Sequence, residues 1–403
     1  MILLNFFLFL FLKVIGAETE HKTVHLWRAQ GDFNDTVLNK FYERASQGED
    51  IWIRENGTID FLLYNEEQDQ IAAYLKEHGL NQTVLIHDVR GKLDEALVKT
   101  FPTKRNAVTG DSFTWTAYPS LHEINEYLIK MAATYPTHCK ISTIGKTAHF
   151  KPIHMLKITN GASNNKAILV DSGTHGREWT SVISTLYFID SIVPKFYQQP
   201  AYVTTKDWYI IPVLNPDGYD YSLTTDRLWR KNRRRLSGMC YGIDLNRNFA
   251  YGWAKEESTQ NVCSSNYCGP VPFSEEETKA FKRVVDGKHF IGYLSIHSAG
   301  TKVLYPRGAD HDDHHKHLFM TKEIALAMRK IGGLQFLNRD IEKMGKIRYG
   351  MAIDWMFFVK QVQHSYILET RGHNGLDYIP PEQILPAAKE VTAGLMKFAE
   401  KFR

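Results

Sequence analysis

Four short apolar segments, each followed by polar residues, constrain the fold of this 403-residue chain more than any other feature. Continuous apolar runs are typical of strands buried on both faces of a sheet. Stretches with helical periodicity separate the four segments. The pattern therefore predicts an α/β domain with a mixed, largely parallel central sheet and helices on both faces. The predicted strands are 167–170, 208–214, 290–296 and 365–368.

Helix boundaries are also marked in this part of the chain. Ser120 and Glu123 form a capping-box pattern ahead of regularly spaced apolar residues. Ser274 with Glu277 marks a second helix start, and residues 381–402 predict a closing helix.

The region before residue 105 has a different organisation. Runs of β-branched residues at 23–27, 51–53 and 84–86 predict strands, and 68–80 predicts a helix. We expect a small α+β module with its own core. Three Asn-x-Thr sequons in this module are candidate glycosylation sites, namely Asn34, Asn56 and Asn81.

Two segments flank this module and indicate processing. Residues 1–17 resemble a secretory signal, because the apolar run 2–12 is too short to span a bilayer and small residues follow it. Lys104 and Arg105 form a dibasic pair in a polar stretch. Either a processing protease cleaves there, or the stretch is an ordinary solvated linker.

The composition excludes several classes of protein. Hydrophobic residues at 43% and charged residues at 23% are typical of a globular fold, and no later segment predicts a membrane span. The net charge is +4, and the basic run 230–235 has no second basic cluster beside it, so we expect no nucleic-acid binding. Four cysteines in an exported chain predict one or two disulfides.

Polar side chains follow each predicted strand at its carboxyl end. His175 and the Asn-Pro-Asp-Gly turn at 215–218 follow the first two strands, and His297 and Glu369 directly follow the other two. Ligands bind beyond the carboxyl ends of the strands in an open α/β sheet. We therefore expect these groups to meet at one edge.

Three of these polar residues predict a metal site. His175 and Glu178 can share an ion if a helix begins near Glu178, although such a pair alone is more often a surface pair at a helix start. With His297 the set has two imidazoles and one carboxylate, which leaves the fourth position open, as in catalytic zinc sites. The sequence therefore predicts one zinc ion per chain.

The remaining polar groups predict a base and an anion site. Glu369 is the candidate general base, and a structural pair with Arg371 is the less attractive alternative. Arg230, Asn246 and Arg247 follow the second strand. A guanidinium group binds a carboxylate through two hydrogen bonds or stabilises an oxyanion, whereas a solvated arginine face is the alternative.

Taken together, these motifs resemble a known family. THGREW, NPDGY, RLWRK, GIDLNRNF, SIHS and ETRG occur in the order and spacing of the zinc metallocarboxypeptidases of the pancreatic A/B type. The leading module, with VLIHDVR, resembles the activation peptide of that family. The resemblance implies a signal peptide at 1–17, a ferredoxin-like activation propeptide at 18–105 and a catalytic domain at 106–403.

The resemblance also implies the chemistry of the site. His175, Glu178 and His297 correspond to the zinc ligands, and Glu369 corresponds to the base that assists attack by zinc-bound water. Arg230 corresponds to the group that stabilises the oxyanion.

Substrate-binding positions are implied in the same way. Asn246 and Arg247 match the residues that hold the terminal carboxylate of the substrate, and Arg177 and Ser298 match weaker contacts. Ile353 matches the bottom of the specificity pocket, where an apolar residue favours aliphatic or aromatic C-terminal side chains.

Two positions depart from the family pattern. The mobile tyrosine that covers substrate in the family falls on Lys346, and the nearest tyrosine is Tyr349. Either Tyr349 substitutes for it or the cover is missing. A second family tyrosine is replaced by Ala299, which predicts a weaker outer subsite.

Cysteines and processing are the last features that the resemblance covers. Cys240 and Cys263 match a family disulfide, while Cys268 either pairs with Cys139 or stays free. Arg105 matches the propeptide cleavage site, which a trypsin-like protease would cut.

The predicted function is that of a secreted, extracellular exopeptidase. It is made as a zymogen, acts as a monomer on peptide or protein C-termini, and has no nucleic-acid or membrane partner. The alternatives are a catalytically silent homologue that binds C-termini and an enzyme with B-type basic specificity. A small-molecule deacylase or amidase would use the same metal chemistry but gives no reason for the Asn246 and Arg247 pair.

Overall fold

The structure is a computed structural model that describes residues 23–46, 51–54, 57–93, 114–238, 240–255, 260–306, 311–340, 349–372 and 377–402. Four features predicted from the sequence lie outside these residues. They are the signal segment 1–17, Asn56, the Lys104-Arg105 pair and Lys346.

The main domain is built on a mixed eight-stranded sheet with the order β11-β10-β12-β9-β7-β8-β6-β5. The four strands predicted from apolar runs are its four central strands and are mutually parallel, which confirms the predicted fold class. They are β7 (Lys166–Ser172), β8 (Lys206–Ile211), β9 (Phe290–His297) and β12 (His364–Glu369). The outer strands are β5 (Cys139–Lys146), β6 (Pro152–Ile158), β10 (Lys302–Tyr305) and β11 (Leu337–Asp340).

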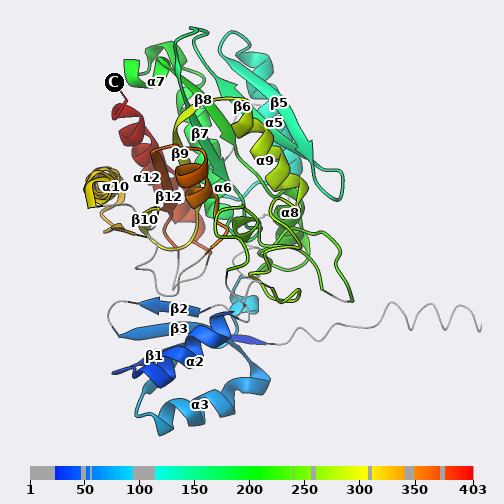
Figure 1. Cartoon of the computed structure of the whole chain (residues 1–403), viewed down its shortest axis with the longest axis vertical. Coiled ribbons are helices and arrows are strands. Elements are labelled where there is room, and N and C mark those ends of the chain that lie inside the picture. The colour runs from blue at the N-terminus through cyan, green and yellow to red at the C-terminus, as the bar shows by residue number, and fades with distance from the viewer. Residues whose placement is uncertain are drawn as a thin grey trace, which may run out of the picture.

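Helices cover both faces of this sheet (Figure 1). In β7, the Ile168 and Val170 side chains pack in a hydrophobic core with residues of four long helices. Ala167 and Leu169 pack in a second hydrophobic core on the opposite face of the sheet. This alternation follows from the two-residue period of a strand and explains the continuous apolar run. The first face carries α5 (Leu121–Thr134), α6 (Trp179–Ile192), α10 (His311–Gly332) and α12 (Pro381–Glu400), and the second carries α9 (Glu276–Asp286) with α11 (Ala352–Asp354).

Short helices complete the connections. They are η2 (Phe196–Gln198), α7 (Ala201–Thr204), α8 (Pro216–Thr224), η3 (Leu245–Arg247) and η6 (Trp355–Val359).

The two predicted helix starts are confirmed, but they are capped differently. Ser120 and Glu123 form the full capping box at the start of α5, as predicted. The helix α9 begins at Glu276, between Ser274 and Glu277 as predicted, but its N-cap is Glu275, which makes no side-chain cap. Ser274 instead donates its hydroxyl to Glu275 (2.7 Å) and accepts from Asn248 (3.0 Å).

The N-terminal module (residues 23–93) is a four-stranded antiparallel sheet with the order β2-β3-β1-β4. Its β-α-β-β-α-β succession is that of a ferredoxin-like fold. The sequence did not predict β3 or α2, because neither has strict periodicity. The elements are β1 (Val24–Gln30), α2 (Asp35–Ser46), β2 (Ile51–Arg54), β3 (Thr58–Tyr64), η1 (Asn65–Glu67), α3 (Gln68–Glu77) and β4 (Asn81–Ile86).

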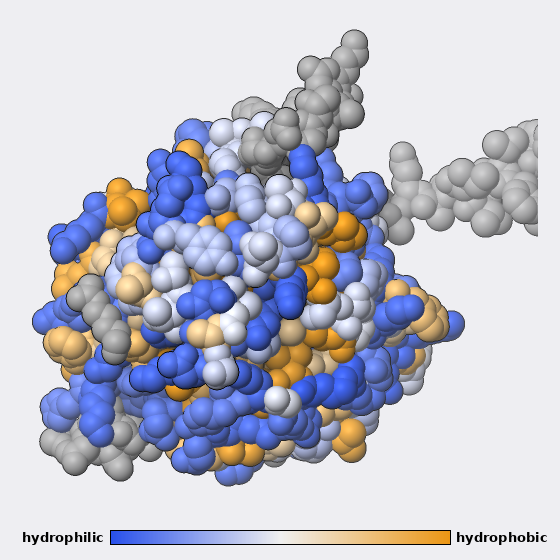
Figure 2. All heavy atoms as spheres, turned by 90° about the horizontal axis from the view of Figure 1, so that it is seen from above, coloured by the Kyte–Doolittle hydropathy of each residue, from blue (hydrophilic) through white to orange (hydrophobic). Residues whose placement is uncertain are grey.

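Within the described ranges, no helix combines the length and the apolar character that a membrane span needs. The end of the molecule away from the N-terminal module is mostly hydrophilic, with separate hydrophobic patches (Figure 2).

A buried carboxylate links α9 to the segment that carries Arg230. Asn232 donates to Glu275 (2.7 Å) and to Glu277 (3.3 Å), and Arg234 pairs with Glu275 (2.7 Å). Burial raises the pKa of the Glu277 carboxyl to about 8, and the negative charge of Glu275 adds to the rise. Folding therefore favours protonated Glu277, and stability falls as the pH rises toward 8.

We expect Glu277→Gln to be more stable than the wild type by about 1 to 3 kcal/mol at pH 9 and nearly equal to it at pH 5. Gln resembles the protonated carboxyl and cannot ionise. The measurement is guanidinium unfolding with zinc present at both pH values. Glu276→Gln, on the same helical turn but solvent-exposed, is the control and should show no such pH difference. Equal stability of Glu277→Gln and wild type at pH 9 would contradict this prediction.

Candidate metal centre

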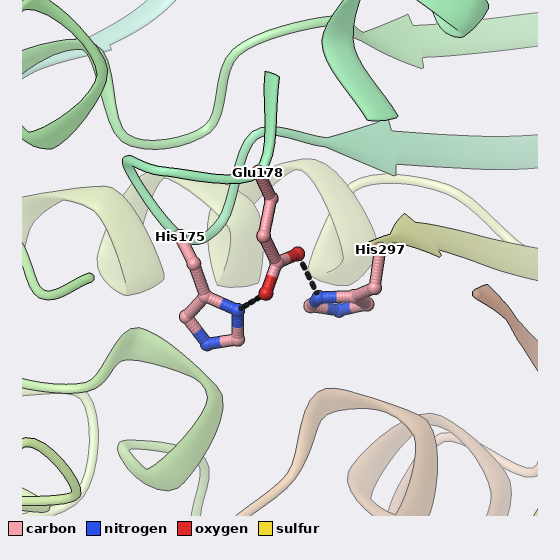
Figure 3. A group of neighbouring side chains, drawn as sticks. All are labelled: His175, Glu178 and His297. Atoms are coloured by element: carbon pink, nitrogen blue, oxygen red, sulfur yellow. Dashed lines mark hydrogen bonds and ion pairs between the residues drawn. The ribbon is translucent and has the colours of Figure 1, made fainter. Parts of the chain in front are cut away.

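Three predicted metal ligands meet at the carboxyl edge of the sheet. His175 lies in the turn after β7, Glu178 is the N-cap of α6, and His297 ends β9. One potential ligand atom from each lies within 4.8 Å of the others, and all three residues are buried. Figure 3 shows both imidazole rings turned toward the Glu178 carboxylate.

The ring nitrogens of the two histidines have separate roles. His175 Nδ1 lies 2.5 Å from Glu178 Oε1, and His297 Nδ1 lies 2.8 Å from Glu178 Oε2. Each Nε2 faces away from this centre, toward Asp244 Oδ1 at 3.1 Å for His175 and toward Ser295 Oγ at 3.0 Å for His297. The two Nδ1 atoms and the carboxylate are thus the converging donors, and outer partners orient both rings.

The donor set fits zinc. Two imidazole nitrogens and one carboxylate form the three-ligand pattern of catalytic zinc sites, which keep one position open. Burial by itself raises the pKa of the Glu178 carboxyl, but His175 and His297 outweigh it and hold the pKa well below its ordinary value. Burial lowers the pKa of His297, but Glu178 outweighs this effect and raises it. The negative charge of Glu178 and the positive charge of a protonated histidine therefore stabilise each other in this centre.

Asp244 connects this centre to the arginines, and the sequence analysis missed it. Its carboxylate is fully buried and contacts His175, while Arg230 donates to Oδ2 from Nε at 3.2 Å and from Nη2 at 2.8 Å. It also accepts from the Asn246 N–H at 2.9 Å, and Arg247 Nη1 lies 3.8 Å away. Burial raises the pKa of Asp244, but Arg230, Arg247 and His175 outweigh it and hold the pKa well below its ordinary value. The available signal was an acidic residue inside GIDLNRNF, two positions before the predicted carboxylate-binding pair.

Asn246 and Arg247 lie in η3, and their backbone is closely held. Arg247 Nη1 donates to the Asn246 carbonyl at 2.7 Å, and Asn246 Oδ1 accepts from the Ala352 N–H at 3.0 Å. Gly350 packs directly on this segment, because a Cβ there would lie 2.2 Å from the Arg247 carbonyl oxygen. Its φ of +68° also requires glycine. Gly350 and Ala352 are therefore held against the predicted carboxylate-binding pair.

Glu369 ends β12 directly opposite His297 in the parallel ladder. Its carboxylate lies on the backbone of Gly300, where a Cβ would be only 1.6 Å from Oε2. The alternative partner, Arg371, is paired with Glu390 instead, with Arg371 Nε donating to Oε2 at 2.9 Å. Glu369 is thus placed at the metal centre and is not used by Arg371.

The weaker substrate-binding candidates lie around this centre. Ser298 donates its backbone N–H to Glu178 Oε2 at 3.2 Å, and Arg177 Nε pairs with Asp377 at 2.7 Å. Tyr349 packs on Gly252, where a Cβ would lie 2.5 Å from its ring, and Lys255 Nζ is 5.5 Å from the ring centre. Tyr349 therefore lies against the 249–255 turn.

Cysteine pairing is settled by the structure. Cys240 and Cys263 form a disulfide with a Cα–Cα distance of 5.1 Å. Cys139 and Cys268 are both buried and neither is in a disulfide, so Cys268 does not pair with Cys139. Of the sequons, Asn34 and Asn81 are exposed.

Comparison with known proteins identifies the family. The model of the peptidase M14 family, described as zinc carboxypeptidase, matches residues 124–394. The chain belongs to this family. Carboxypeptidase A1 of Rattus norvegicus is 32% identical over 360 residues, which are 86% of this chain and 85% of that protein. Carboxypeptidase A5 of Homo sapiens is 28% identical over 363 residues, 87% of this chain and 83% of that protein.

Solved structures agree with this assignment. Thrombin activatable fibrinolysis inhibitor superposes with a TM-score of 0.80 at 26% identity, over 94% of this chain and 98% of that one. Carboxypeptidase A from Helicoverpa armigera superposes with a TM-score of 0.83 at 22% identity, over 94% of this chain and 98% of that one. This similarity shows the shared fold. The protein is therefore a metallocarboxypeptidase, a hydrolase of a zinc-dependent family.

We expect Asp244→Asn to weaken zinc binding by about 10 to 100-fold, because the amide no longer holds the His175 ring as a carboxylate does. Competition for zinc with a chromogenic chelator measures the change. Asp207→Asn is the matched control, since Asp207 is also buried but bonds to Thr159, Asn165 and Lys157. Unchanged zinc affinity in Asp244→Asn would show that Asp244 does not support the metal site.

Proposed function

We propose that this zinc carboxypeptidase removes single aliphatic or aromatic residues from the C-termini of peptides, with one zinc ion held by His175, Glu178 and His297. One observation carries the proposal. Asp244 contacts a metal ligand, Arg230 and the backbone of Asn246 at the same time. Cleavage at a free C-terminus requires an anion-binding segment beside the metal centre, and these contacts support that role for the segment with Asn246 and Arg247.

Each residue then has a defined task. When bound, zinc supplies a Lewis acid that polarises the scissile carbonyl and makes water more acidic. Glu369, opposite His297, accepts the proton of the attacking water and passes it to the leaving amine. Arg230 stabilises the negative charge that develops on the carbonyl oxygen. Asn246 and Arg247 bind the C-terminal carboxylate and so set the position of the scissile bond.

The proposed preference for the C-terminal side chain of the substrate follows from Ile353. This residue is fully buried and packs among apolar side chains. A charged Lys or Arg side chain would lose its hydration there without gaining a partner. The proposal therefore favours apolar C-terminal residues over basic ones, in contrast to a B-type enzyme.

A zymogen is supported by the contact between the N-terminal module and the main domain. Val24, Leu26, Val89 and Leu93 form a buried cluster against which Leu228 and Tyr378 pack. Arg90 of the module also pairs with Asp226 at 3.1 Å. The contacted segment leads into Arg230.

Processing and location complete the proposal. Arg105 is the proposed activation site for a trypsin-like protease, and the signal at 1–17 would direct secretion of a monomer. The exposed Asn34 and Asn81 are then available for glycosylation, and Asn56 is a third candidate.

A catalytically silent homologue is the second candidate. The position of the family's mobile tyrosine is Lys346, and Tyr349 lies against Gly252 and Lys255. A catalytically silent homologue would follow if Tyr349 does not take over the covering role.

Hydrolysis decides between an enzyme and a silent homologue. After treatment of the full chain with trypsin, we expect peptides that end in an apolar residue, Leu or Phe, to be cleaved faster than those that end in Arg or Glu. A zinc chelator should abolish this activity and added zinc should restore it. We expect Glu369→Gln to lose about 10² to 10⁴-fold in kcat while it keeps its zinc.

Glu126→Gln, an exposed residue on α5, is the control and should keep full activity. Absence of hydrolysis with zinc bound would favour the silent homologue. Faster cleavage of C-terminal Arg would overturn the proposed specificity.

The uncut chain should have at most a few per cent of the activity of the cleaved one. We expect Leu93→Asp to raise the activity of the uncut chain, because a buried carboxylate would weaken the contact with Leu228 and Tyr378. The initial rate on a short peptide before protease treatment measures this effect. Tyr64→Asp, at a 44% exposed position of the same module, should leave the uncut chain inactive. Full activity of the uncut wild type would contradict the proposal that the chain is a zymogen.

A further inference from the structure

We infer that Met351 narrows the specificity pocket, so that the enzyme takes small aliphatic C-terminal residues such as Ala and Val in preference to Phe, Tyr or Trp. The inference rests on the proposed function and refines its broad apolar specificity. It starts from the surroundings of Ile353, the residue proposed to form the bottom of the pocket.

Ile353 is covered by three other large apolar side chains. Together with Leu304, Met351 and Ile367 it forms a cluster of its own, distinct from the two cores that flank the sheet. The exposed fractions are 0% for Ile353, 2% for Leu304, 3% for Ile367 and 4% for Met351. The four side chains thus bury one another in the resting protein.

This cluster adjoins the groups proposed to hold and cleave the substrate. Leu304 in β10 pairs with Ile367 in β12, and in the same antiparallel ladder Lys302 pairs with Glu369. Ile367 and Glu369 are two apart in the strand, so they lie on the same face of the sheet. On the other side, Ala352, which follows Met351, donates its N–H to Asn246.

The backbone around the cluster is held in place. The Phe249 N–H donates to the Gly350 carbonyl at 3.0 Å, and Gly350 donates to the Tyr251 carbonyl at 3.2 Å. Gly350 also packs on the Arg247 carbonyl. Leu304 and Ile367 are fixed by their strands. The pocket therefore widens through movement of the Met351 side chain, because the backbone at Gly350 is held.

Met351 is the member of the cluster that can move most easily. Methionine is unbranched, has three rotatable side-chain bonds and adapts to irregular gaps, whereas Leu and Ile have fewer rotamers. A methyl or isopropyl group can enter after a small shift of the Met351 side chain. An aromatic ring requires much more space in a close-packed region, and a misfit of one methylene already changes kcat/KM by about 10 to 200-fold.

The test compares peptides that differ only in their C-terminal residue, Ala, Val or Phe, with the full chain after trypsin treatment. We expect the wild type to favour Ala and Val over Phe by at least about 10-fold in kcat/KM. We expect Met351→Ala to raise kcat/KM for Phe, and the ratio of kcat/KM for Phe to that for Ala, at least about 10-fold.

Met320→Ala is the matched control. Met320 on α10 has the same exposed fraction of 4% but belongs to the main core, so its truncation removes the same atoms away from the cluster. It should leave the ratio of Phe to Ala cleavage at the wild-type value, even if it lowers stability.

Several outcomes separate this inference from the proposed function. Wild-type cleavage of Phe that equals or exceeds that of Val overturns the inference, and so does a Met351→Ala variant that gains nothing on Phe. If no peptide is cleaved, the proposed function fails. Calorimetry with the Glu369→Gln variant then still measures how tightly the pocket binds each of the same peptides. Tighter binding of Val than Phe, reversed by adding Met351→Ala, supports the inference, and equal affinities overturn it.

Discussion

The active site depends on one buried carboxylate, that of Asp244. It holds the outer nitrogen of His175, binds the Arg230 guanidinium and accepts from the backbone of Asn246. A buried charge is stable only when it is paired and hydrogen-bonded, so its partners are confined to one geometry. Asp244 therefore couples the metal centre to the groups proposed to bind an anionic substrate end.

The parallel sheet brings the remaining groups to the same place. His297 and Glu369 are partners at the ends of β9 and β12, and Glu178 caps the helix that follows β7. A strand end positions a side chain precisely because the hydrogen bonds between neighbouring strands fix its backbone. Gly350 and Gly300 provide the close approaches that position the neighbouring loops. Function at this edge thus follows from main-chain geometry as much as from the polar side chains.

Much of the fold was predictable, for identifiable reasons. The four central strands carry continuous apolar runs because both of their faces are buried, and Ser120 with Glu123 is a local signal that needs no distant partner. Strand β3 and helix α2 were missed because their pattern is interrupted by polar residues. The start of α9 was also predicted, although Ser274 is not its N-cap, because Ser274 is bound by Asn248 from another segment.

The sequence by itself determined the chemical types at the site: two imidazoles, two carboxylates, the arginines and an amide, each next to a predicted strand or in a recognisable motif. It could not show that Asp244 joins them, because that role depends on contacts between residues far apart in the chain. It also named Ile353 but not Leu304, Met351 and Ile367 as its neighbours. Only tertiary structure decides which side chains share a volume, since packing is set by strand register and loop conformation, which local sequence does not encode.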